Sequence, residues 1–207
     1  MRQLIDLETW NRKDHFNFFN QFEEPYFGIC VEIDSTKAYM KAKALNSSFF
    51  LYYLHKILVA VNHVEPFRYR ISDGQVYVYD KINASPPIDR PDGTFGYAYI
   101  DYYEDFLKFS NEAGIIVEQV RNSKGLFPSN SGDNVIHFSA VPWINFTSVS
   151  HPRRFSFKDS CPKIAVGKMT MNGEKKTFPL SVHVHHALMD AYQVGLFVDK
   201  FQQVMND

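Results

Sequence analysis

The chain has 207 residues, a formal net charge of −1 and a hydrophobic fraction of 45%. This length and apolar content suit one folded domain over residues 1–207 rather than a disordered chain, and the near-neutral charge, without a basic tail or stripe, argues against a nucleic-acid partner. Two cysteines without CxxC spacing, no apolar leader and no run of about 20 apolar residues predict a cytoplasmic protein with no membrane contact.

The first half of the chain mixes helical and strand patterns. Thr9 is expected to cap a short helix in the aromatic segment 6–22, and Tyr26–Ile33 has the β-branched and aromatic content of a strand. An apolar stripe at helical spacing predicts a helix over residues 49–63. An Asp-Gly pair between two alternating segments predicts a hairpin over residues 67–79.

The second half also combines both kinds of element. Prolines and a glycine predict a loop over residues 84–94, followed by an aromatic strand, and a helix is expected over residues 103–121. Late strands are expected at residues 135–140, 146–149, 164–170 and 177–185, the last two joined by a hairpin turn around Asn172-Gly173. An amphipathic helix begins near Asp190. Strands and helices without strict alternation favour an α/β sandwich with an antiparallel or mixed sheet over a doubly wound fold.

The segment 183–190, His-Val-His-His-Ala-Leu-Met-Asp, lies where the last strand meets the last helix. Strand alternation places His183 and His185 on one face, and His186 with the valines on the more buried face. A histidine near neutral pH can take a hydroxyl proton and return it, so His186 is a candidate general base; by itself, a satisfied buried histidine is the simpler interpretation. The same-face histidine pair offers two metal ligands, but no nearby Cys or Glu completes a set, and no metal is expected.

Three further side chains are candidates for chemistry. Asp190, with Gln193 three residues later, resembles a capping box and can also pair with a cation. Ser148 is a candidate nucleophile or oxyanion donor, although without a Gly-x-Ser-x-Gly elbow a plain strand serine is the simpler interpretation. Arg12 lies between polar neighbours, in the pattern of a solvated helix charge.

Four segments, taken together and in order, resemble the chloramphenicol acetyltransferase family over nearly the whole chain: Trp10–Phe16, Pro66–Gly74, Pro142–Ser148 and Pro179–Asp190. The resemblance implies a two-layer α/β sandwich of the CoA-dependent acyltransferase type, with a mixed, largely antiparallel sheet and helices packed on it. It also implies a homotrimer with active sites between neighbouring subunits. Such an enzyme uses acetyl-CoA to acetylate a hydroxyl of chloramphenicol and so gives antibiotic resistance.

The family's motifs also imply roles for residues of this chain. His186 corresponds to the general base, and Asp190 with Arg12 to a salt bridge that holds the active-site turn. Ser148 corresponds to a hydroxyl that donates to the oxyanion, so no acyl-enzyme is expected. Phe27 matches an aromatic position of the acceptor pocket.

Three departures from the family pattern leave alternative functions open. Ala191 stands where the family has a glycine, Ala165 stands where it often has a threonine, and the segment 86–99 aligns poorly. An alanine at position 191 would be strained if that position requires a positive φ. Besides chloramphenicol acetylation, the alternatives are acetylation of another hydroxylated small molecule and a ligand-binding relative that has lost efficient catalysis.

Overall fold

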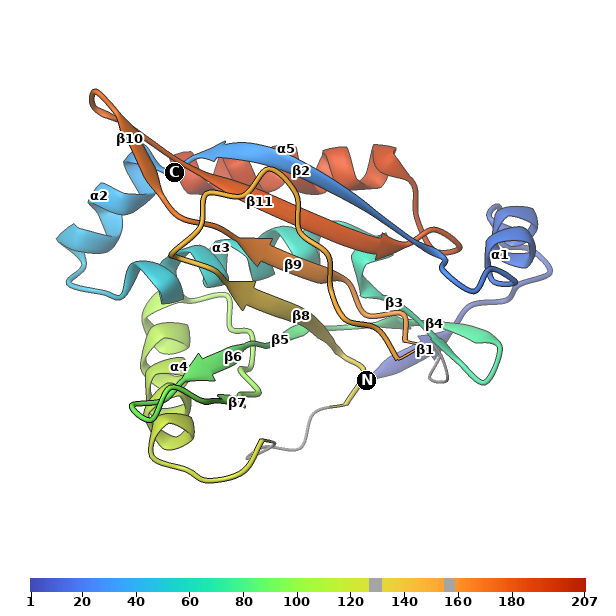
Figure 1. The fold of residues 1–207 in the computed structure, drawn as a ribbon. Coiled ribbons are helices and arrows are strands. Elements are labelled where there is room, and N and C mark those ends of the chain that lie inside the picture. Colours follow the sequence, from blue (N-terminus) through green and yellow to red (C-terminus); the bar gives the residue numbers. More distant parts are fainter. Residues whose placement is uncertain (127–131, 155–158) are drawn as a thin grey trace.

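The computed structural model describes residues 1–126, 132–154 and 159–207, and these form a six-stranded sheet, two smaller sheets and helices (Figure 1). In chain order the elements are β1 Arg2–Leu4, α1 Lys13–Phe19, β2 Tyr26–Asp34, α2 Thr36–Ala44, α3 Phe49–His63, η1 Glu65–Arg68, β3 Tyr69–Ser72, β4 Gln75–Tyr79, β5 Asn83–Ser85, β6 Pro87–Asp89, β7 Phe95–Tyr97, α4 Phe106–Arg121, β8 Val135–Ala140, β9 Lys163–Val166, β10 Thr170–Asn172, β11 Lys175–His185 and α5 Ala191–Asn206.

The large sheet is built around β11. This strand pairs antiparallel with β2 from the residue pair Thr177–Asp34 to the pair His185–Tyr26. It also pairs antiparallel with β9 and β10, whereas β9 with β8 and β8 with β5 run parallel. The sheet is therefore mixed and largely antiparallel, as predicted.

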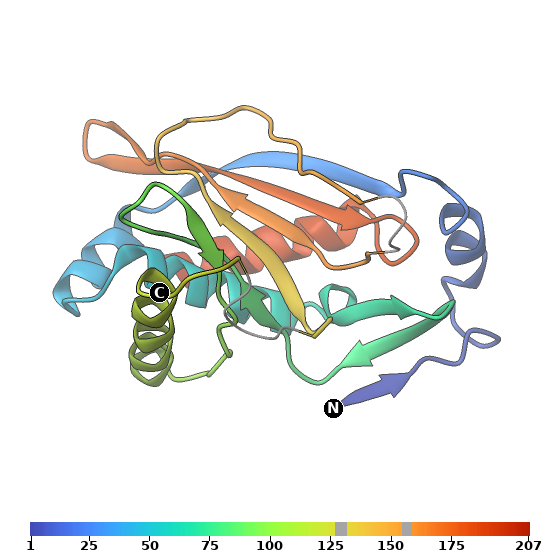
Figure 2. The same cartoon turned by 60° about the horizontal axis from the view of Figure 1, so that its bottom comes forward.

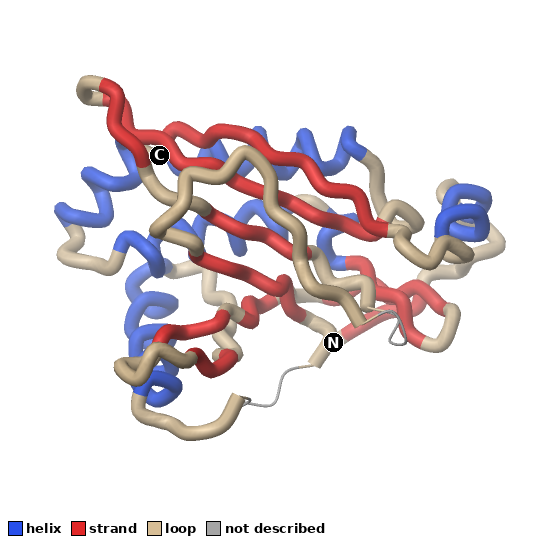
Figure 3. The backbone as a smooth tube through the Cα atoms, in the orientation of Figure 1, coloured by secondary structure: helices blue, strands red, loops and turns tan. Residues whose placement is uncertain are grey.

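Helices cover one face of this sheet. Figure 2 shows α3 and α5 on the same side of the strands, and the described part of the segment after β8 crosses the opposite side in Figure 3. The apolar stripe of α3 is fully buried, and Phe67 from η1 stacks on Phe197 of α5 with ring centroids 4.6 Å apart. None of the described helices alone has the length and hydropathy of a bilayer span; α2 and α3 reach that limit only as a pair bent by 120°. The core of the predicted two-layer sandwich lies between α3, α5 and the sheet.

Tight turns fix the register of both predicted hairpins. Asp73 and Gly74 connect β3 to β4 with φ values of 51° and 73°, the two positive values that a type I′ turn requires. Gly173, with φ of 59°, lies in the turn between β10 and β11. Both turns lie where the sequence predicts them.

The structure corrects three local predictions. The region 84–94 is not all loop, because it contains β6, which begins at Pro87. Proline has no amide hydrogen to donate, but it is tolerated as the first residue of a strand that lies outside the main sheet. Residues 146–149 form no strand, since this segment crosses over the large sheet instead of joining it. Thr9 caps no helix, because α1 begins only at Lys13, and its hydroxyl donates instead to Asp6 Oδ2 at 3.0 Å.

Truncating one central core side chain tests the packing of this layer. Leu54 on α3 is 0% exposed, so Leu54→Ala leaves a cavity and should lower the free energy of unfolding by about 2–5 kcal/mol. Leu107 on α4 is 58% exposed, so Leu107→Ala should change it by less than about 0.5 kcal/mol. Denaturant unfolding of both variants measures the difference, and equal effects would contradict this packing.

Candidate active site

The turn between β11 and α5 is held by hydrogen bonds of its backbone amides at both ends. The carbonyl of His185, the last residue of β11, accepts from the amides of Leu188 at 2.9 Å and Met189 at 3.3 Å. At the other end, the Asp190 amide donates to Gln193 Oε1 at 2.8 Å, one bond of the predicted capping box. Local hydrogen bonds thus hold part of this turn, and the amide of His186 donates to the distant carbonyl of Pro25 at 2.8 Å.

Arg12 ties this turn to the start of α1. Its guanidinium donates to both carboxylate oxygens of Asp190 at 2.6 Å, to the carbonyl of His186 at 2.7 Å and to that of Ala187 at 3.1 Å. The Arg12 side chain is only 12% exposed. A bidentate, charge-assisted pair that also satisfies two carbonyls defines the position of the turn as well as its conformation. Arg12 is thus a largely buried, ion-paired side chain rather than the solvated helix charge that its sequence neighbours suggest.

The charge of Asp190 is stabilised by this arrangement. Hydrogen bonding from Arg12, aided by the attraction of its positive charge, lowers the pKa of the Asp190 carboxyl below its usual range. Asp190 is therefore a carboxylate at neutral pH, and one of its oxygens, Oδ1, also lies 3.1 Å from Nδ1 of His186.

The His186 ring lies in an aromatic setting. It stacks on Phe19 of α1 with centroids 3.9 Å apart and planes inclined by 14°, and Phe27 of β2 contacts it at 4.7 Å. The side chain is 34% exposed, so the imidazole packs against aromatic rings and still remains accessible to solvent. Nδ1 is buried and makes no hydrogen bond to the nearby carboxylate, so Nε2 is the nitrogen left for proton exchange with a ligand.

The buried-face prediction for His186 is wrong. β11 ends at His185, so strand alternation stops before His186, and its ring leaves the sheet to lie between Phe19 and Phe27. His185 instead is 5% exposed and contacts Tyr26 edge-on at 5.5 Å. Of the two adjacent histidines, His186 is the more exposed to solvent.

Phe19 is a site residue that the sequence analysis missed. It belongs to a group of mutually contacting phenylalanines with Phe18 and Phe22, which are 58% and 45% exposed. The sequence does contain a signal for it. The segment around this short helix holds more phenylalanines than the core contact of one helix face requires. This exposed aromatic surface continues from the stacked face of His186.

Ser148 is not joined to the other candidates within one chain. It is exposed in the segment 141–154, and among the described residues it has no hydrogen bond to His186 or Asp190. A cavity of about 400 Å³ opens beside α1 and is lined by His185, Phe22 and Arg153, but His186 does not line it. One chain thus brings together Arg12, Phe27, His186 and Asp190 and leaves Ser148 apart.

The charge of Asp190 can be removed while its capping ability is kept. In Asp190→Asn the enclosed guanidinium of Arg12 loses its counter-charge, so we expect a lower free energy of unfolding near pH 7. Because folding lowers the pKa of Asp190, the wild-type advantage is complete above the ordinary carboxyl value of about 4 and decreases as the pH falls through the lower folded value.

Denaturant unfolding of wild type and Asp190→Asn near pH 7 and near pH 3 measures this advantage. Asp199→Asn, at an exposed position of the same helix, is the matched control and should have little effect at either pH. A deficit for Asp190→Asn that does not shrink in acid would contradict the role given to the ion pair.

Comparison with known proteins identifies the relatives of this chain. The family model described as chloramphenicol acetyltransferase matches residues 2–202. A chloramphenicol acetyltransferase of Proteus mirabilis is 28% identical over 99% of this chain and 94% of its own length, and one of Staphylococcus aureus is 30% identical over 97% and 94%.

Solved structures agree with these sequence matches. A chloramphenicol acetyltransferase structure superimposes with a TM-score of 0.92 at 32% identity and covers 99% of this chain and 100% of its own. The dihydrolipoamide acetyltransferase of Azotobacter vinelandii shares the fold with a TM-score of 0.69 at 16% identity, covering 94% and 86% of the two chains.

Proposed function

The chain belongs to the chloramphenicol acetyltransferase family, and from this premise we propose that it transfers the acetyl group of acetyl-CoA to a hydroxyl of chloramphenicol. The observation that carries the proposal is the placement of His186, with one ring nitrogen at 3.1 Å from an ion-paired carboxylate and its ring face on Phe19. An enzyme of this activity gives resistance to the antibiotic. Acetyl-CoA acts as co-substrate.

His186 is the general base in this proposal. Its Nε2 takes the proton of the acceptor hydroxyl as that oxygen attacks the carbonyl carbon of the thioester. The tetrahedral intermediate then collapses, the carbon–sulfur bond breaks, and the CoA thiolate leaves with the proton from the imidazolium. Asp190 lies beside Nδ1 and favours the transient positive charge on the ring.

The other candidate residues support this step. Ser148 donates its hydroxyl hydrogen to the oxyanion, and the acetyl group never bonds to the enzyme. Arg12 is a positioning residue, because it acts through the turn and through Asp190. Phe27 contacts the His186 ring and offers an aromatic face to the acceptor.

Ala191 does not weaken the case for catalysis. Among the described non-glycine residues, only Asn46 and Asp73 have a positive φ, and Ala191 is the first residue of α5. The conformation at this position therefore tolerates a β-carbon. This removes the main structural reason to assign the chain to the catalytically impaired relatives.

Substitution of the base and of the oxyanion donor tests the mechanism. We expect His186→Ala to abolish turnover nearly completely, and Ser148→Ala to lower kcat by about 100- to 1,000-fold. CoA thiol release from acetyl-CoA with chloramphenicol as acceptor is the readout. His63→Ala, at an exposed position at the end of α3, should retain wild-type rates. Undiminished turnover in His186→Ala would exclude this residue as the base.

A second candidate function is acetylation of a different hydroxylated small molecule. It is favoured by the segment 86–99, which departs from the family pattern and forms the β6–β7 pair beside α4. A panel of hydroxylated acceptors in the same thiol-release assay separates the two functions. Higher kcat/KM for another acceptor than for chloramphenicol would favour the second one.

The active form in this proposal is a homotrimer whose sites lie between subunits. The support is that one chain holds His186 at its aromatic face but leaves Ser148 exposed and without a hydrogen bond to it among the described residues. Each complete site then combines His186 of one subunit with Ser148 of its neighbour.

Mixed assemblies test this arrangement. Co-refolding His186→Ala with Ser148→Ala should restore a measurable fraction of wild-type turnover, because some sites regain both intact residues. Co-refolding His186→Ala with His186→Gln, which cannot supply the histidine, should restore none. A molar mass in solution of a single chain, or no rescue in the first mixture, would contradict the two-subunit site.

A further inference from the structure

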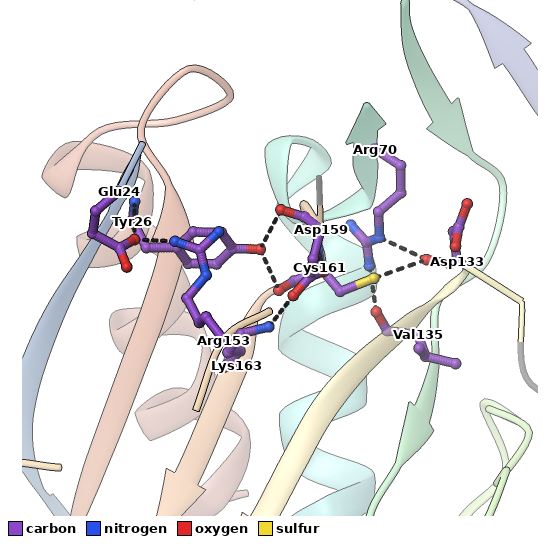
Figure 4. Close-up of polar contacts among 9 residues, drawn as sticks. All are labelled: Glu24, Tyr26, Arg70, Asp133, Val135, Arg153, Asp159, Cys161 and Lys163. Carbon is purple, nitrogen blue, oxygen red and sulfur yellow. Dashed lines mark hydrogen bonds and ion pairs between the residues drawn. The ribbon is translucent and has the colours of Figure 1, made fainter. Parts of the chain in front are cut away.

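A group of potential metal ligands lies next to Tyr26 and outside the set of Arg12, Phe27, His186 and Asp190. His137 comes from β8, and Asp159 and Cys161 come from the segment that leads into β9. Because β8 and β9 run parallel with His137 paired to Lys163, the two elements bring these three side chains together. Figure 4 shows Asp159 and Cys161 at the centre of a network of polar contacts.

The three side chains converge closely. Each offers one ligand atom, an imidazole nitrogen, a carboxylate oxygen and a sulfur, and these atoms all lie within 4.8 Å of one another. The Cys161 amide donates to Asp159 Oδ1 at 2.8 Å, which orients the carboxylate relative to the thiol. Sulfur, nitrogen and oxygen together suit Zn²⁺ or Co²⁺ rather than Mg²⁺ or Ca²⁺, which prefer oxygen alone.

The ligand group is partly buried but remains accessible to solvent. Cys161 is 6% exposed, whereas His137 lies at the surface. All three residues line one cavity of about 670 Å³. A zinc ion with three protein ligands completes its tetrahedral coordination with water or an exogenous ligand, and this cavity provides the space.

Two positive side chains oppose a cation at this position. Lys163 forms an ion pair with Asp159, and both side chains are largely enclosed. Arg70 is also buried, but its guanidinium donates to the backbone carbonyls of Asp133 at 2.7 Å and Val135 at 2.6 Å, so it is held in place. Lys163 therefore neutralises Asp159 in the metal-free protein and is the group that a metal must displace.

We propose that His137, Asp159 and Cys161 form a three-ligand site for Zn²⁺ or a similar transition-metal ion, made of residues other than those that the acetyl-transfer step uses. On binding, the S–H bond of Cys161 breaks, its sulfur bonds to the metal and its proton passes to solvent. The Lys163 ammonium keeps its protons and leaves Asp159 for the cavity. Burial raises the pKa of the Cys161 thiol to about 11, so metal binding competes with its protonation.

Cobalt is the appropriate probe, because a thiolate ligand gives Co²⁺ a near-ultraviolet charge-transfer band that histidine sites elsewhere do not produce. Titration of the full chain with Co²⁺ should generate this band, and Zn²⁺ should remove it by displacement. Cys161→Ser should lose the band, and His137→Gln should raise the Kd by about 10- to 100-fold or more. Cys30→Ser, which removes the other cysteine, should leave the band intact.

A substitution of Lys163 separates a metal site from a simple ion pair. Lys163→Met removes the competing cation and leaves Asp159 without its partner, so Co²⁺ should bind about tenfold more tightly. Zn²⁺ should also raise the Tm of this variant more than that of wild type. If Lys163→Met fails to fold, the wild-type and Cys161→Ser titrations still decide. No thiolate band in wild type, or a band that persists in Cys161→Ser, would overturn the proposal.

Discussion

The contact on which the site depends is the one between the Arg12 guanidinium and the turn that ends at Asp190. It joins residues 178 positions apart and fixes two backbone carbonyls as well as one carboxylate. Geometry of this kind exists only when α1 and the end of β11 have both docked. The orientation of the His186 ring is therefore a property of the completed fold, although the turn beneath it is capped by its own residues.

Local order could be predicted from the sequence where one pattern dominates. The stripe of α3, the Asp-Gly turn and the Asp190–Gln193 cap involve residues a few positions apart, so spacing alone indicates them. Spacing alone did not single out His186 as the base; the family resemblance did. His186 was expected to continue the buried strand face, whereas the strand ends one residue earlier.

Long-range partners could not be predicted from local pattern. Nothing near Arg12 in the chain indicates that it pairs with Asp190, and only the family resemblance suggested it. The stack of Phe19 on His186 also depends on where α1 docks. The segment 146–149 has the composition of a strand but forms none, so its tertiary context overrides its propensity.

The central position of β11 has a consequence for synthesis of the protein. Its partner β2 leaves the ribosome more than a hundred residues earlier, and at about 5–20 residues per second it waits roughly 7 to 30 seconds for β11. During that time β2 is an unpaired, largely apolar edge, the kind of surface that pairs with other chains. The nascent chain thus remains exposed to misassembly until β11 and the turn 186–190 are made.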